Sequence, residues 1–255
     1  MLATLHAAFK RSSWLKRILI LLFIGLIVLS ACSYPNKNGS GNNTTQGIKY
    51  GGALTIVPGP YGAFTRFFNP FTGDNAALSG TRGMIYETLM FFNREKNTIQ
   101  PWLAAGYSWS ADLTRLTFKL RQGVQWSDGQ PFTSDDVAFT LNLLHQYPAL
   151  DANSLWAFIK EVTTPDAYTV VITFKQPSFP EQWYLAGQTY IVPRHIWQHF
   201  KNPVSEANPD PVGTGPFILQ SFDPALYVLG RNARYWQPGK PYIDELRYPA
   251  KQTVA

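Results

Sequence analysis

The sequence is poor in the residues that cross-link chains or carry out chemistry. Its 255 residues include one cysteine, Cys32, which excludes a disulfide within one molecule and a metal site built from several cysteines. There are four histidines and no G-x-S-x-G segment, so a serine hydrolase has no motif in its favour. The acidic residues have no recognisable motif around them. We therefore expect a protein that is not an enzyme.

The charge is also too low to support a nucleic-acid partner. The formal net charge is +6, but Lys10, Arg11, Lys16 and Arg17 all precede the first long apolar run. Setting these four aside from the 22 basic residues leaves 18 against 16 acidic residues, a net charge of +2. The remaining charges are scattered without a basic stripe, which argues against nucleic-acid binding. With 45% apolar residues, the chain can still build a sizeable core.

The first 48 residues are typical of a targeting signal followed by a tether. Basic residues precede an apolar run, Ile18–Val28, that is too short to cross a bilayer comfortably. The next four residues, LSAC, resemble a lipobox, which predicts a lipoprotein signal peptide over residues 1–31 and lipidation of Cys32. An ordinary membrane anchor helix with an incidental cysteine is the alternative. Residues 32–48 have almost no apolar content and are expected to form a flexible tether.

The stretch Leu116–Leu144 has the clearest local pattern. Apolar and polar residues alternate over 116–120, which predicts a strand with one buried face. Turn-forming residues follow at 126–131. Thr133 and Asp136 have the spacing of a capping box, and apolar residues then recur at helical spacing. The stretch therefore predicts a strand, a turn and a capped helix that ends at Tyr147-Pro148.

Two long motifs carry a family resemblance. Phe118–Val137 reads F-x-L-R-x-G-V-x-W-S-D-G-x-P-F-T-x-x-D-V, and Gly213–Tyr248 opens with G-T-G-P-F and continues to R-N-x-x-Y-W and K-P-x-I-D-E. Both closely resemble the peptide-type (family 5) extracellular solute-binding proteins of ABC importers. The resemblance covers Tyr50–Tyr248.

The resemblance implies a fold and a division into domains. The fold is a mixed α+β structure of the α/β class, the first lobe of a type II (cluster C) periplasmic-binding-protein-like architecture. Lobe I is expected at 49–86 and 193–255, with an inserted extra domain at 87–192. Family members have a second lobe that closes over the ligand, and we expect it to be missing because the chain stops at Ala255.

Further elements are expected from local patterns and from the family order. They are a strand over 51–57, a short helix over 83–90, a strand over 168–174, a helix over 177–185, and a hairpin of 217–222 and 226–231 around a turn at 223–225.

The resemblance also implies where a ligand is held. In the family, the backbone after an Asn-Pro turn, a large aromatic residue and the return segment to lobe I all approach the cleft. The matching substrate-binding candidates here are Phe71, Gly73, Asp74, Asn75, Trp156, Gly187 and Gln188. A solvated surface loop is the alternative for the loop residues, and a core aromatic is the alternative for Trp156.

Two patterns that could suggest other chemistry are weak. His195 and His199 have the i, i+4 spacing of zinc ligands, but Ile196 stands where an H-E-x-x-H motif needs glutamate, and no third ligand is evident. Gly213-Thr214-Gly215 lacks the pattern of a phosphate-binding loop. We expect no metal site and no cofactor.

The expected function is solute capture. A monomeric, lipid-anchored protein on the outer face of the cell membrane, facing the periplasm or the exterior, would capture oligopeptides or dipeptides and deliver them to an ABC permease. The same architecture also binds nickel, haem, opines or oligosaccharides in other family members. An exported hydrolase and a purely structural surface lipoprotein are the less favoured alternatives.

Overall fold

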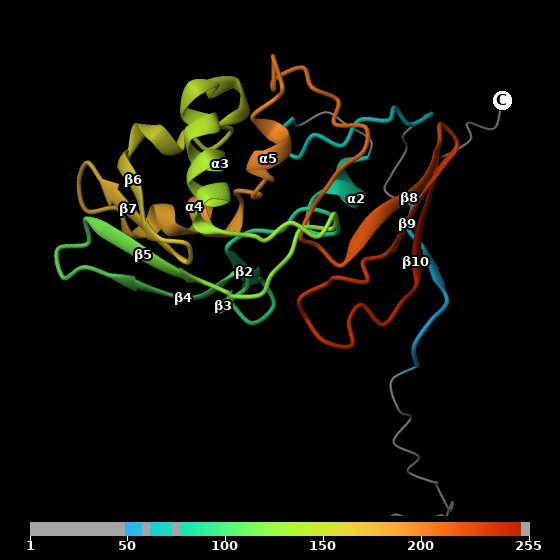
Figure 1. The fold of residues 1–255 in the computed structure, drawn as a ribbon, viewed down its shortest axis with the longest axis horizontal. Helices are drawn as coiled ribbons and strands as arrows, with labels where there is room; N and C mark the ends of the chain where they lie inside the picture. The colour runs from blue at the N-terminus through green and yellow to red at the C-terminus, as the bar shows by residue number, and fades with distance from the viewer. Residues whose placement is uncertain (1–48, 58–61, 73–76, 251–255) are drawn as a thin grey trace, which may run out of the picture. The chain divides into compact units, whose positions relative to one another are not determined.

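The computed structural model describes residues 49–57, 62–72 and 77–250, and Figure 1 shows their arrangement. The expected signal peptide and tether, including Cys32, lie outside the described residues, as do Gly73, Asp74 and Asn75. Among the described residues, no helix is both long and apolar enough to cross a membrane. The fold is mixed α/β, which is the predicted class, and contains two four-stranded sheets and a two-stranded hairpin.

The first sheet brings the start and the end of the described chain together. Its order is β1-β10-β9-β8, with β1 parallel to β10 and the other pairs antiparallel. The strands are β1 Ala53–Thr55, β8 Phe217–Asp223, β9 Leu226–Arg231 and β10 Glu245–Pro249. The predicted hairpin is confirmed, because Asp223 pairs with Leu226 across a turn of Pro224 and Ala225.

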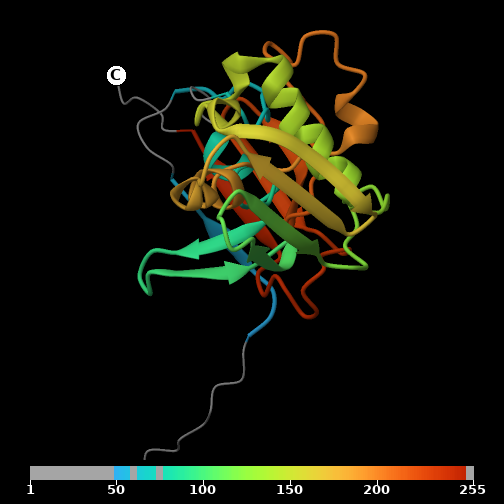
Figure 2. The ribbon, with the colours of Figure 1, turned by 90° about the vertical axis from the view of Figure 1, so that its left-hand side faces the viewer.

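The second sheet is antiparallel, in the order β4-β5-β7-β6. Its strands are β4 Ala104–Trp109, β5 Arg115–Leu120, β6 Ile159–Asp166 and β7 Thr169–Phe174. The predicted strand at 116–120 is confirmed with its alternation: Leu116, Phe118 and Leu120 are buried. Helix α3, Ser134–Gln146, packs against β6 and β7 and covers one side of this sheet (Figure 2).

The start of α3 explains much of the first motif. The capping box is present, and the Asp136 Oδ2 atom accepts a hydrogen bond from the Thr133 backbone N–H at 2.9 Å. The Oδ1 atom accepts another from the Arg194 N–H at 2.9 Å, and the Trp126 indole lies 3.3 Å from Oδ2. One buried carboxylate therefore ties the turn, the helix and a distant loop together. Burial raises the pKa of Asp136.

Short elements connect the sheets. They are α2 Leu78–Thr81, β2 Met90–Asn93, β3 Thr98–Pro101, α4 Gln182–Gly187, α5 Arg194–Trp197, and the 3-10 helices η1 Pro148–Leu150, η2 Leu155–Ala157 and η3 Phe179–Glu181. The helix predicted over 177–185 is found as η3 followed by α4, a shift of two residues.

The helix predicted over 83–90 is wrong. This segment forms turns and isolated bridges before β2 begins at Met90. The reason is tertiary: the carbonyl of Ile85 accepts a hydrogen bond from the Gly215 N–H at 2.8 Å, and that of Met84 accepts one from the Phe217 N–H at 3.0 Å. An α-helix would need the same carbonyls for its own i to i+4 bonds.

The two histidines do not share a helix face. Helix α5 ends at Trp197, before His199, and the His195 Nε2 atom lies 2.7 Å from the Asp128 Oδ2 atom. Among the described residues, no group of three or more His, Cys, Asp or Glu side chains could hold a metal ion.

The expected division into lobe and extra domain stays a prediction. The described residues all lie in one compact unit. Within it, the first sheet is built from the segments assigned to lobe I, and the second sheet from the segment assigned to the extra domain.

Candidate functional site

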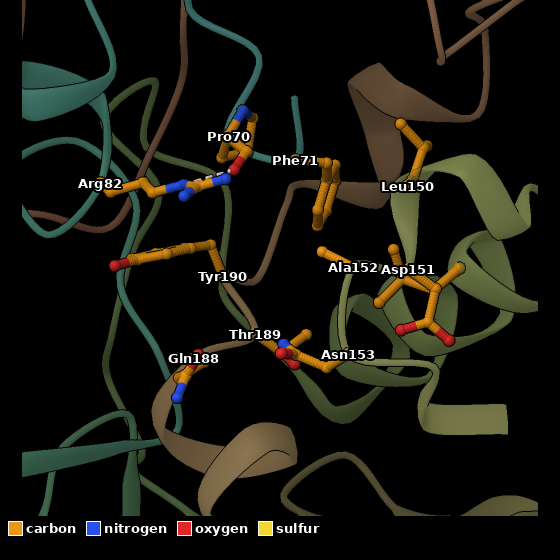
Figure 3. A pocket seen from close by; sticks show the side chains of 11 residues that line it. Pro70, Phe71, Arg82, Leu150, Asp151, Ala152, Asn153, Gln188, Thr189 and Tyr190 are labelled. Carbon is orange, nitrogen blue, oxygen red and sulfur yellow. Dashed lines mark hydrogen bonds between the residues drawn. The ribbon is translucent and has the colours of Figure 1, made fainter. Parts of the chain in front are cut away.

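An open pocket of about 110 Å³ lies where three loops meet (Figure 3). The loops follow the Asn69-Pro70 turn, the helix η1 and the helix α4. Its lining residues are Pro70, Phe71, Arg82, Leu144, Leu150, Asp151, Ala152, Asn153, Gln188, Thr189 and Tyr190. The lining combines apolar and polar side chains, as sites for small solutes do.

Asn69 fixes the loop that carries Phe71. Its fully buried side chain donates hydrogen bonds to the carbonyls of Pro203 and Glu206, both at 3.0 Å. Its Oδ1 atom accepts a hydrogen bond from the Phe71 N–H at 3.0 Å. The Phe71 ring packs edge-on against Trp197, with centroids 5.4 Å apart. Phe71 is therefore held in place from both its backbone and its ring.

Arg82 and Tyr190 form the opposite side of the pocket in Figure 3. The Arg82 Nε atom donates a hydrogen bond to the Pro70 carbonyl at 2.8 Å, and the guanidinium carbon lies 5.7 Å from the centre of the Tyr190 ring. Burial lowers the pKa of Arg82 and raises the pKa of Tyr190. Arginine stays protonated despite such a shift, and the contacts with Pro70 and Tyr190 orient the guanidinium plane of Arg82.

The loop after η1 supplies two further polar side chains to the pocket. Asp151 and Asn153 both line the pocket. The Asp151 Oδ2 atom accepts a hydrogen bond from the Trp156 backbone N–H at 3.4 Å, which holds the start of η2 against the loop. Ser154 adopts a left-handed backbone conformation with φ of 52°, so the chain turns sharply between the pocket and η2.

The structure brings together two of the predicted site residues, Phe71 and Gln188. Gly187 instead packs on the Trp183 ring beside a small crevice. Trp156 lies outside the pocket lining: its indole N–H donates to the Leu141 carbonyl at 2.7 Å, and its ring stacks on His145 at 3.9 Å. A ligand-binding role for all seven predicted residues stays a prediction.

The sequence reasoning did not single out Arg82, Asp151, Asn153 or Tyr190 as pocket residues. A usable signal existed for Arg82, because it is the one charged residue between Asp74 and Glu87. The other three follow no local pattern, since only the meeting of loops distant in sequence brings them to one pocket.

A second polar centre lies around Glu87, which is 2% exposed. Its Oε1 atom accepts hydrogen bonds from the Trp102 indole at 2.7 Å and the Tyr235 hydroxyl at 3.0 Å. Its Oε2 atom accepts one from the Trp236 indole at 2.9 Å. Burial raises the pKa of Glu87 to about 7, although the hydrogen bonds oppose this shift. The carboxylate joins three segments far apart in sequence, which indicates a structural role.

The G-T-G-P motif is a packing device in this structure. A Cβ atom placed on Gly213 would lie well under 3.0 Å from the backbone of Ile85, and one on Gly215 would meet the backbone of Met84. The two glycines let one chain segment approach another at hydrogen-bonding distance.

The fold is similar to that of solved periplasmic binding proteins. An oligopeptide-binding protein of an ABC transporter from Thermotoga maritima matches with a TM-score of 0.68 at 28% identity, covering 81% of this chain and 38% of that chain. NikA from Brucella suis, solved in complex with Fe(III)-EDTA, matches with a TM-score of 0.64 at 26% identity, covering 78% and 39%. The class is therefore that of the periplasmic binding proteins.

Sequence comparison identifies the family. Residues 98–253 match the bacterial extracellular solute-binding proteins, family 5 Middle. A candidate ABC transporter peptide-binding protein of Brucella ovis is 34% identical over 215 residues, covering 80% of this chain and 39% of the relative. The chain belongs to the family 5 bacterial extracellular solute-binding proteins, and it spans about 39% of the length of this relative.

Proposed function

We propose that this chain forms part of the ligand-binding wall of an ABC importer's solute-binding protein, and that its ligands are short peptides. The observation that carries the proposal is the meeting of Phe71 and Gln188 in one pocket. These two residues come from separate segments, and both were expected at the cleft. The name of the Brucella ovis relative, which mentions peptide binding, supports the ligand class.

The proposed mechanism is capture without chemistry. The division into a lobe at 49–86 and 193–255 and an extra domain at 87–192 belongs to this proposal. Family 5 members close a second lobe over the ligand by hinge motion, and the closed form is then presented to a permease. Backbone groups and polar side chains around the pocket would hold the peptide main chain, with water filling the gaps.

Peptide binding is tested by melting the purified chain with a library of dipeptides to tetrapeptides. Binding at a hundredfold excess over Kd stabilises a protein by about 2.7 kcal/mol, so we expect a clear rise in Tm for some peptides. Mass spectrometry of the released ligand should recover it unmodified. A cleaved product would indicate a hydrolase, and no shift with any peptide would contradict the proposal.

A lipid anchor at Cys32 is the second part of the proposal, and it rests on the LSAC motif. We expect the protein extracted from native membranes to begin at Cys32 and to carry added lipid mass. The Cys32→Ala variant should lose that mass and leave the membrane fraction. An unmodified Cys32 in the membrane form would indicate an ordinary anchor helix instead.

A further inference from the structure

We propose that the Arg82 guanidinium binds a carboxylate of the ligand, so that the pocket selects peptides by an anionic group. The inference rests on the proposed function and specifies its ligand class. The carboxylate has two possible sources, the free C-terminus of a peptide or an Asp or Glu side chain.

The two Nη atoms of Arg82 are available for further hydrogen bonds. Nε is occupied by the Pro70 carbonyl, and the guanidinium carbon lies 5.7 Å from the centre of the Tyr190 ring. No described residue accepts a hydrogen bond from either Nη atom. Figure 3 shows the guanidinium lying over the Tyr190 ring and reaching toward the Pro70 carbonyl at one side of the pocket. Because Arg82 lines the pocket, a ligand bound there could accept hydrogen bonds from its two Nη atoms.

Arg82 forms no ion pair with a described residue, although the Asp151 carboxylate lines the same pocket. The side chain is half-buried, so part of its hydration is lost without a carboxylate to replace it. An arginine fork matches a carboxylate with two parallel hydrogen bonds, and such charge-assisted bonds are about twice as strong as neutral ones. A ligand carboxylate would supply the missing partner.

The test compares four probe peptides on the full chain. Trialanine with a free C-terminus is compared with trialanine amide, and Ala-Glu-Ala amide with Ala-Gln-Ala amide. We expect the member of at least one pair that carries the carboxylate to bind about 10- to 100-fold more tightly. The first pair reports on the C-terminus and the second on a side chain.

Three variants separate recognition from folding. Arg82→Gln should remove the preference for the carboxylate, and Arg82→Lys should keep part of it, because lysine retains the charge but not the fork. Arg94→Gln is the matched control, since Arg94 is exposed in the β2–β3 turn, and it should keep the full preference. Denaturant unfolding of each variant identifies a loss caused by misfolding.

Asp74, outside the described residues, provides a further control. If Asp74→Asn and Arg82→Gln destabilise the ligand-free chain equally and not additively, Arg82 serves an internal ion pair and the inference is overturned.

The outcomes distinguish this inference from the proposed function. Equal binding of all four peptides by the wild type overturns the role of Arg82 and leaves peptide binding intact. If no peptide binds, N-acetylalanine is used as a simple carboxylate probe. Stabilisation of the wild type but not of Arg82→Gln then supports the carboxylate site and contradicts peptide binding. No stabilisation by either probe overturns both.

Discussion

Replacing Gly213 with alanine is expected to destabilise the fold by about 3 kcal/mol or more, since overpacking against backbone cannot be relieved by a rotamer change. The added Cβ would meet the carbonyl of Ile85, which also accepts the hydrogen bond from the Gly215 N–H. Relief therefore requires the two segments to separate and lose their bonds. Urea unfolding measures the change, and soluble yield and protease resistance report on it if the variant does not fold.

Gly106→Ala is the control for this prediction. Gly106 lies in β4, has no atom within 4 Å of a built Cβ, and has no positive φ. Its replacement should change stability by less than about 1 kcal/mol. Equal stability of the Gly213 and Gly106 variants would contradict the assigned packing role.

Replacing Glu87 with alanine is expected to cost about 3–5 kcal/mol, because three aromatic donors would lose a shared buried acceptor. Glu87→Gln should cost less, about 1–3 kcal/mol, since one oxygen remains while the amide N–H₂ faces a donor. Glu161→Ala, on the exposed side of β6, is the control and should be nearly neutral. Chemical denaturation of the three variants measures these differences.

Glu87 also predicts a pH dependence of stability. The pKa of Glu87 is about 7 in the folded protein against an ordinary value of 4.5. Between these values the folded state binds more protons than the unfolded state, so the free energy of unfolding falls as the pH rises through this window. The expected fall is on the order of 3 kcal/mol and is complete above pH of about 7. Glu87→Gln should remove this part of the slope, and an unchanged slope would contradict it.

Part of the fold could be predicted because it depends on residues close together in the chain. The alternation over 116–120 marks one buried strand face, and Thr133 and Asp136 cap α3 within one helical turn. The turn at Pro224 and Ala225 likewise closes its hairpin locally. In each case the interaction partner lies a few residues away, so the sequence pattern was sufficient.

The candidate site could be predicted only in part. The family resemblance pointed to Phe71 and Gln188, and both line the pocket. It also pointed to Trp156, whose indole is occupied by the Leu141 carbonyl and whose ring stacks on His145. Whether an aromatic residue packs in the core or faces a pocket depends on its contacts with other segments. These contacts cannot be predicted from the residues next to it in the sequence.

The sequence by itself determined the class of this protein, because its two long motifs are those of a family 5 solute-binding chain. Only the tertiary structure decided the path of residues 83–90, whose carbonyls bond to Gly215 and Phe217 more than 120 residues away. It also decided that Arg82 lines a pocket together with Asp151 and yet forms no ion pair with a described residue. Both features depend on groups distant in sequence, because buried polar atoms take whichever partner the packed chain supplies.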